Sequence, residues 1–178
     1  MEQSAKLVYQ VNKIIQMHLD RGLGYQKARS LVTDDALKSL FEQYIQQSYY
    51  FAEKLQASMA LQGMETHAKA SWTGTVYRGW MILRVGASSR KDRAVLCCCL
   101  AAEKMMNLSY ELLCSNKYLQ YYFPLLKFTF LKQHFSLTKT REELESVSLR
   151  YGRDTVQSVE SRESFPVINH LSKEPSVS

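Results

Sequence analysis

The chain has 178 residues, 46% hydrophobic and 22% charged, which suits one globular domain with a substantial core. The whole net charge of +6 belongs to residues 1–149, and an excess of this size is too small to indicate nucleic-acid binding. No apolar run approaches the roughly 20 residues that span a bilayer, and no signal peptide is evident, so we expect a cytoplasmic protein without a transmembrane segment.

The first predicted helix spans about Ser4 to Leu31, because apolar and aromatic residues recur there at steps of three and four. Its predicted inward face consists of Leu7, Val11, Ile14, Ile15, His18, Gly22 and Tyr25. A glycine on an inward face usually lets a neighbouring element approach closely, and Gly22 predicts such a contact.

The second predicted helix begins after Thr33 and Asp34, which offer an N-cap, and stops near Gly63. Its inward face consists of Leu37, Leu40, Phe41, Tyr44, Ser48, Phe51, Leu55 and Met59. The link to the first helix is short, so we expect the two helices to lie antiparallel.

A polar connection, Met64 to Thr75, precedes a third helical segment that starts at Val76, pauses at residues 86–89 and resumes behind Asp92. The inward positions of the resumed part are Leu96, Cys99, Glu103, Met106, Tyr110 and Leu113.

Ser115 or Asn116 caps the fourth predicted helix, whose apolar face includes Phe123, Leu126, Phe130, His134 and Leu137. Pro124 either kinks this helix or marks its true first turn. Periodicity fades beyond about Arg150. We therefore expect a helical domain over residues 1–149 and a flexible tail over residues 150–178, with one apolar island at 165–168.

The segments Phe41–Gln47 and Phe51–Leu55, the motif Tyr77-Arg-Gly-Trp-Met81 and His134 stand in an order that resembles a family. This is a bacterial family of ferritin-like four-helix-bundle proteins, known mainly as a domain of unknown function. The resemblance covers roughly residues 7–145 and implies an all-α, antiparallel four-helix bundle.

The chain departs from this family where a metal site would need carboxylates. No Glu stands three residues before a His, although carboxylate-bridged di-metal bundles carry Glu-x-x-His on two helices. Positions that tend to be acidic in the family hold other residues here: Gln16, Gly22, Lys27, Tyr50, Cys98, Leu100 and Thr129. We therefore expect the di-metal site to be lost, and no cofactor is expected.

Two interpretations remain open for the inward-facing polar residues. His18, Glu103 and His134 could form an atypical mononuclear zinc or iron site, with Glu53 or Asp20 as a further oxygen donor. Alternatively, Glu103 pairs with a histidine or a tyrosine hydroxyl in a buried hydrogen-bonded network, since an unpaired buried carboxylate is costly.

The remaining patterns do not indicate an enzyme. Cys97, Cys98, Cys99 and Cys114 lack metal-ligand spacing and read as small buried hydrophobes, or as a redox site if one thiol faces solvent. A basic stretch formed by Arg78, Arg84, Arg90, Lys91 and Arg93 is either a solvated face or a weak contact for an anionic membrane surface. The leading hypothesis is a non-enzymatic bundle that acts through protein contacts, by self-association or with a regulatory or stress-related partner.

Overall fold

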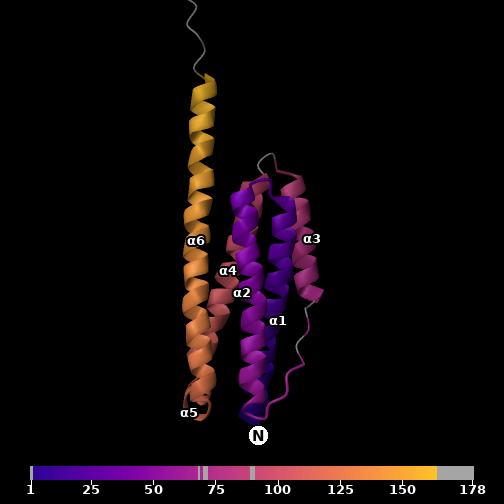
Figure 1. The fold of residues 1–178 in the computed structure, drawn as a ribbon, viewed down its shortest axis with the longest axis vertical. Helices are drawn as coiled ribbons and strands as arrows, with labels where there is room; N and C mark the ends of the chain where they lie inside the picture. The colour runs from indigo at the N-terminus through magenta and orange to yellow at the C-terminus, as the bar shows by residue number, and fades with distance from the viewer. Residues whose placement is uncertain (1, 68, 70–71, 89–90, 164–178) are drawn as a thin grey trace, which may run out of the picture.

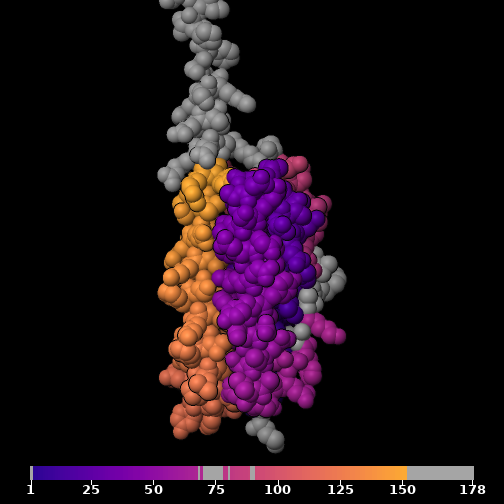
Figure 2. Space-filling view, in the orientation of Figure 1, coloured from indigo at the N-terminus to yellow at the C-terminus, as the bar shows by residue number. Residues whose placement is uncertain are grey.

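The computed structural model describes residues 2–67, 69, 72–88 and 91–163, and the regular structure in these ranges is all helical. Four long helices lie side by side: α1 (Glu2–Leu31), α2 (Asp35–Ala60), α4 (Lys91–Cys114) and α6 (Pro124–Glu163) (Figure 1). α1 packs against α2 and α4, and α6 packs against the same two helices. Figure 2 shows α6 lying along α2 on one face of the molecule. The predicted all-α class is confirmed.

The link between α1 and α2 forms as the sequence predicts. Asp34 is the N-cap of α2, and its carboxylate accepts hydrogen bonds from the backbone N–H groups of Ala36 (2.7 Å) and Leu37 (3.3 Å). Gly22 meets the ring of Tyr49 so closely that a Cβ atom would lie 2.9 Å from its Cζ atom. The close approach expected at Gly22 is therefore present, and it is made by α2.

The third predicted segment is two separate helices, α3 (Trp72–Gly86) and α4. α3 starts within the predicted polar connection and packs against both α1 and α4, where Met81 and Val85 are buried. The start of α4 is tied to the α1–α2 link, because the Asp92 carboxylate accepts hydrogen bonds from Thr33 N (2.9 Å) and Thr33 Oγ1 (3.0 Å).

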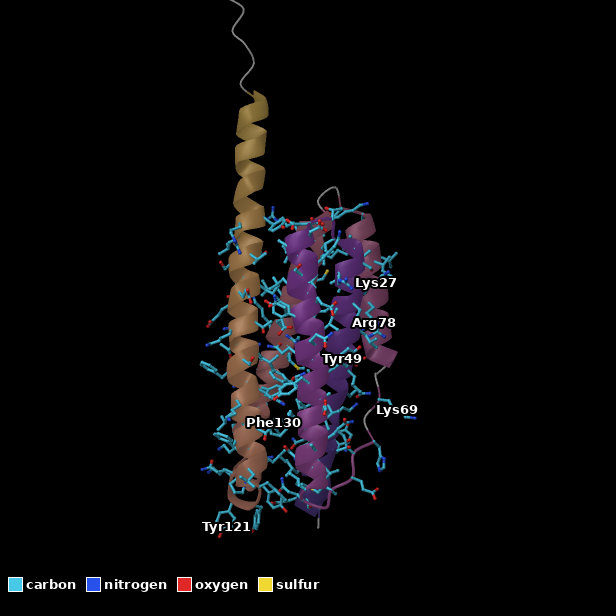
Figure 3. The ribbon with its side chains drawn as sticks, in the orientation of Figure 1. Lys27, Tyr49, Lys69, Arg78, Tyr121 and Phe130 are labelled. Atoms are coloured by element: carbon cyan, nitrogen blue, oxygen red, sulfur yellow. The ribbon has the colours of Figure 1, made fainter. Side chains whose placement is uncertain are left out.

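Pro124 marks a helix start and not a kink. Asn116 caps the short helix α5 (Lys117–Tyr122), the chain leaves helical geometry at Phe123, and α6 begins at Pro124, where a missing N–H costs nothing. Phe130 points from α6 into the bundle, whereas Tyr121 on α5 points away from it (Figure 3).

α6 continues to Glu163, so residues 150–163 are helical where we predicted a flexible tail. Tyr151 contributes to this extension, because its hydroxyl donates a hydrogen bond to the Asp34 carboxylate at the opposite link. Burial and the bonded carboxylate both raise the pKa of Tyr151. Residues 164–178, including the apolar island, lie outside the described residues.

The core consists of two hydrophobic clusters. One is formed around Val11, Ile15, Leu55, Tyr110 and Phe130, and the other around Tyr25, Phe41, Leu96, Cys99 and Leu144. Buried polar residues lie between these clusters along the chain of each long helix: His18 and Arg21 on α1, Ser48 on α2, Glu103 on α4 and Thr140 on α6. The long helices therefore share a polar layer near the middle of the bundle.

Candidate functional site

The centre of the polar layer is an ion pair between Arg21 on α1 and Glu103 on α4. Arg21 Nε donates to Glu103 Oε1 at 2.6 Å, and the two side chains are only 5% and 1% exposed. Arg21 lies three residues after His18 and four before Tyr25, so it shares the inward face of α1. Glu103 lies four residues after Cys99 and faces the same interior from α4.

The remaining donors of the Arg21 guanidinium are used on α2. They reach Ser48 Oγ (2.7 Å), Gln47 Oε1 (2.8 Å) and the Tyr44 carbonyl (3.3 Å). Burial is the largest single influence and lowers the pKa of Arg21, but Glu103 together with Tyr25 and Tyr44 outweighs it, and the pKa is raised. Arg21 is therefore a permanently charged group inside the bundle, and each of its three guanidinium nitrogens donates at least one hydrogen bond.

The network continues to α6 through Gln47. Its Nε2 atom donates to Ser136 Oγ at 3.1 Å, and the Tyr44 hydroxyl donates to Glu143 Oε2 at 2.7 Å. All four long helices are thus linked through the partners of one guanidinium. Such a network fixes the axial register of the helices, because sliding one helix by a turn along its neighbours would leave buried charges without their partners.

Glu103 is less completely satisfied than its partner. The Tyr25 hydroxyl donates to Glu103 Oε1 at 2.7 Å, so this oxygen accepts from both Tyr25 and Arg21. Burial and the Glu103 charge raise the pKa of Tyr25 well above its usual value, which keeps the hydroxyl a donor. Glu103 Oε2 is buried and has no hydrogen-bond partner. The site therefore holds one unused acceptor that carries negative charge.

A second polar chain runs beside this pair and contains His18. Gln133 Nε2 donates to the Phe51 carbonyl (3.1 Å), so Gln133 Oε1 is turned to accept the Tyr110 hydroxyl (2.6 Å). The Tyr110 oxygen then accepts from His18 Nε2, 2.5 Å away, which leaves His18 Nδ1 without a proton or a partner. Burial, aided by the positive charge of Arg21, lowers the pKa of His18 well below 6.5, so the ring is neutral.

The structure does not assemble His18, Glu103 and His134 into a metal site. His18 binds Tyr110 and Glu103 binds Arg21, whereas His134 lies at the α4–α6 boundary with its Nε2 4.0 Å from Glu111 Oε1. Within the described ranges, no three His, Cys, Asp or Glu side chains are grouped so that they could hold a metal ion.

The two further donors considered for that site are also elsewhere. Glu53 is exposed on α2, and Asp20 forms an ion pair with Arg78 on α3 at 3.6 Å. Figure 3 shows Arg78 beside α1. Of the two interpretations of Glu103, the geometry matches the buried network, with a tyrosine hydroxyl as one of the partners.

Sequence reasoning missed Arg21, although the signal was present. The inward face of α1 was assigned through His18, Gly22 and Tyr25, and Arg21 occupies the same face within this interval. A buried ion pair is expected when one helix has a basic residue on its inward face and another helix has an acidic one, because neither charge is normally buried without a counterion.

An apolar cavity of about 380 Å³ adjoins the ion pair between α1, α3 and α4. Arg21, Tyr25 and Glu103 contribute its polar wall. Four of the seven methionines of the chain line the remainder: Met17, Met81, Met105 and Met106. The cavity therefore combines an adaptable apolar lining with one charged pair.

The four cysteines are free thiols, of which Cys98 and Cys99 are buried and Cys97 and Cys114 partly exposed. Cys99 also lines the cavity. Burial, with the Glu103 charge as a second cause, raises the pKa of Cys99 far above its usual value. Cys99 therefore behaves as a small apolar residue and not as a nucleophile.

The helices that carry the ion pair, α1 and α4, lie almost wholly within a segment that matches a known family. The family model for a domain of unknown function (DUF2383) matches residues 6–114. The chain belongs to the DUF2383 family. No curated protein and no solved structure matches it.

The DUF2383 match includes Arg21, Glu103, His18 and Tyr110, but it ends before Gln133 and the rest of α6. Among the described residues, no helix of this DUF2383 member is long and apolar enough to cross a membrane. The family description itself assigns no activity, so any function must be argued from the surfaces and the interior of the bundle.

Proposed function

We propose that this protein is a non-enzymatic cytoplasmic scaffold, a ferritin-like antiparallel four-helix bundle that acts by binding a second copy of itself. The observation that carries the proposal is an exposed apolar surface on α4 and α6, which we call the outer face. It consists of Met105, Leu108 and Leu112 on α4 and of Phe128, Leu131 and Phe135 on α6, each between 46% and 68% exposed.

The six residues of the outer face recur at helical spacing. On α4 they follow one another at steps of three and four, and the three on α6 do the same. The two helices are joined at Asn107, whose Nδ2 donates to the Leu137 carbonyl (3.4 Å) and whose Oδ1 accepts from Thr138 (3.0 Å). The two stripes therefore lie on either side of this polar seam, one on each helix.

The size of the outer face suits a dimer contact. Six large apolar side chains, each about half exposed, offer on the order of 600 Å² of apolar area, against the roughly 800 Å² that each partner buries in a stable interface. Exposed apolar area of this extent is at the upper end of what a typical monomer shows, and such surfaces often mark binding sites.

The charges around the outer face favour a second copy as the occupant. Lys132 and Lys139 lie over the rings of Phe128 and Phe135, each with its Nζ 4.5 Å from the ring centroid. Acidic side chains, Glu111 and Glu145, lie along the same seam. A surface that carries both signs can pair with itself about a two-fold axis, with the lysines of one copy near the carboxylates of the other.

Sedimentation velocity of the full chain over a range of concentrations tests the proposal. We expect a dimer for the wild type and a monomer for Leu112→Glu combined with Phe128→Glu, because each new carboxylate would be buried without a partner. The matched control is Leu61→Glu, a residue 88% exposed at the end of α2, which should leave the dimer intact. A monomeric wild type, or a double variant that still dimerises, would refute the proposal.

A further inference from the structure

The cavity beside the Arg21–Glu103 pair shares only Met105 with the outer face and has the features of a ligand site. At about 380 Å³ it lies within the range of roughly 300–1,000 Å³ that small-molecule sites occupy. Its lining includes four methionine side chains, whose flexible thioethers adapt to different apolar shapes. Such a lining offers few partners for water, which needs two to four hydrogen bonds to be held in place.

One residue of this wall, Glu103, has a buried polar atom that lacks a partner. Glu103 lines the cavity, its Oε1 atom already accepts from Arg21 and Tyr25, and its buried Oε2 atom accepts from nothing. A buried carboxylate oxygen without a donor costs free energy, because it has lost water and gained no replacement. A ligand that brings a donor to this oxygen would recover that cost.

The surrounding charges indicate that the ligand is neutral. Glu103 is balanced by Arg21 at 2.6 Å, and Asp20, which also lines the cavity, is balanced by Arg78 at 3.6 Å. A cation or an anion bound here would leave one charge buried without a counterion. A neutral molecule with one hydroxyl avoids this penalty and uses the free acceptor.

We propose that the cavity binds a neutral, mainly apolar alcohol or phenol whose hydroxyl donates to Glu103 Oε2 while the remainder packs against Met17, Met81, Met105 and Met106. This ligand site is distinct from the proposed self-association. It uses the side of α4 that faces α1, and of the outer face only Met105 also lines it.

Methyl NMR of protein labelled at its methionine methyl groups provides a local readout, because four of the seven methionines line the cavity. The probes are p-cresol and toluene, which differ only in the hydroxyl. Titration with p-cresol should shift the four cavity methyl signals more than those of Met59 and Met64. Toluene should bind at least about tenfold more weakly, since a hydrogen bond to a charged group contributes roughly 1.5–3 kcal/mol.

Gly24 supplies a matched pair of variants that should not disturb folding. It lines the cavity, and a Cβ atom placed on it would have no other atom within 4 Å. Gly24→Ala should retain p-cresol binding, whereas the larger side chain in Gly24→Leu should occupy the cavity and abolish the shifts. Absence of cavity shifts at millimolar p-cresol, equal affinity for toluene, or full binding by Gly24→Leu would each overturn the proposal.

Discussion

The Arg21–Glu103 pair should behave as a strongly coupled unit, which can be tested with Arg21→Met, Glu103→Leu and the double variant. Both side chains are at most 5% exposed, so removal of either leaves a charge that water cannot reach. Breaking a buried pair from one side typically costs about 3–5 kcal/mol of unfolding free energy, whereas apolar replacement of both partners is often tolerated.

The hydrogen bonds that remain in each single variant predict which of the two loses more unfolding free energy. Without Glu103, the guanidinium keeps its acceptors on Ser48, Gln47 and Tyr44; without Arg21, the carboxylate keeps only the Tyr25 hydroxyl. Arg21→Met should therefore lie near about 5 kcal/mol and Glu103→Leu near about 3 kcal/mol.

In the double variant no charge remains unpaired. Ser48 Oγ still donates to the Tyr44 carbonyl and Gln47 still reaches Ser136, so the main loss is the partner of the Tyr25 hydroxyl. That loss is worth about 1–3 kcal/mol. The double variant should thus be more stable than Arg21→Met, and the single and double effects together give a coupling energy of about 5–7 kcal/mol.

Urea unfolding followed by far-UV circular dichroism measures the four free energies of this cycle. The same cycle on the exposed pair Lys38–Asp35 (2.8 Å; 41% and 93% exposed) is the control, and its coupling should not exceed about 0.5 kcal/mol. If the Arg21 and Glu103 substitutions are additive to within about 0.5 kcal/mol, the pair is solvated and the reasoning fails.

Three further predictions concern single residues. The pKa of His18 is lowered from 6.5 in the folded protein, so below pH 6.5 the unfolded chain binds more protons than the folded one, and the free energy of unfolding should fall by up to about 1.4 kcal/mol per pH unit. If the free energy of unfolding of His18→Gln changes with pH in parallel with that of the wild type, this prediction is wrong. Gly22→Ala should lower the melting temperature, because the clash with the Tyr49 ring (about 1–3 kcal/mol) outweighs the gain in helix propensity (about 1 kcal/mol). Gly24→Ala, which meets no such neighbour, should raise the melting temperature, and shifts of the same sign for both variants would refute the close contact at Gly22. Burial raises the pKa of Cys99, so mass spectrometry after brief iodoacetamide treatment should find Cys97 alkylated before Cys99, and the reverse order would show that the Cys99 thiol is not buried.

The sequence predicts correctly those features that a few neighbouring residues specify, such as helix caps and the buried faces of helices. The Asp34 cap and the inward faces of α1, α2 and α4 depend on spacing within a few residues, and all are present. Of the two alternatives for Pro124, the helix start is the one observed. The need of Glu103 for a partner also followed from its position on an inward stripe. The identity of that partner could not be predicted, because Arg21 lies 82 residues away in the sequence and the periodicity of two helices does not specify which of their residues meet.

The departures from prediction have physical causes as well. The interruption predicted near Gly86 is present, but it separates two helices that pack against one another, α3 and α4, where a single interrupted helix was expected. α6 extends beyond the ends of its neighbours (Figure 1), where a helix needs no inward stripe. Loss of periodicity after Arg150 therefore signalled the end of the bundle and not the end of the helix.

The position of α6 after α1 to α5 in the sequence has a consequence for synthesis. Leu126, Phe130 and Leu137 complete one core cluster, and Leu144 and Val147 complete the other, yet α6 follows all the remaining helices in the sequence. During translation, the α1–α2 hairpin can form early, but both cores stay open until about residue 147 has left the ribosome. Until then the nascent chain exposes the apolar faces of the earlier helices that α6 covers in the folded bundle.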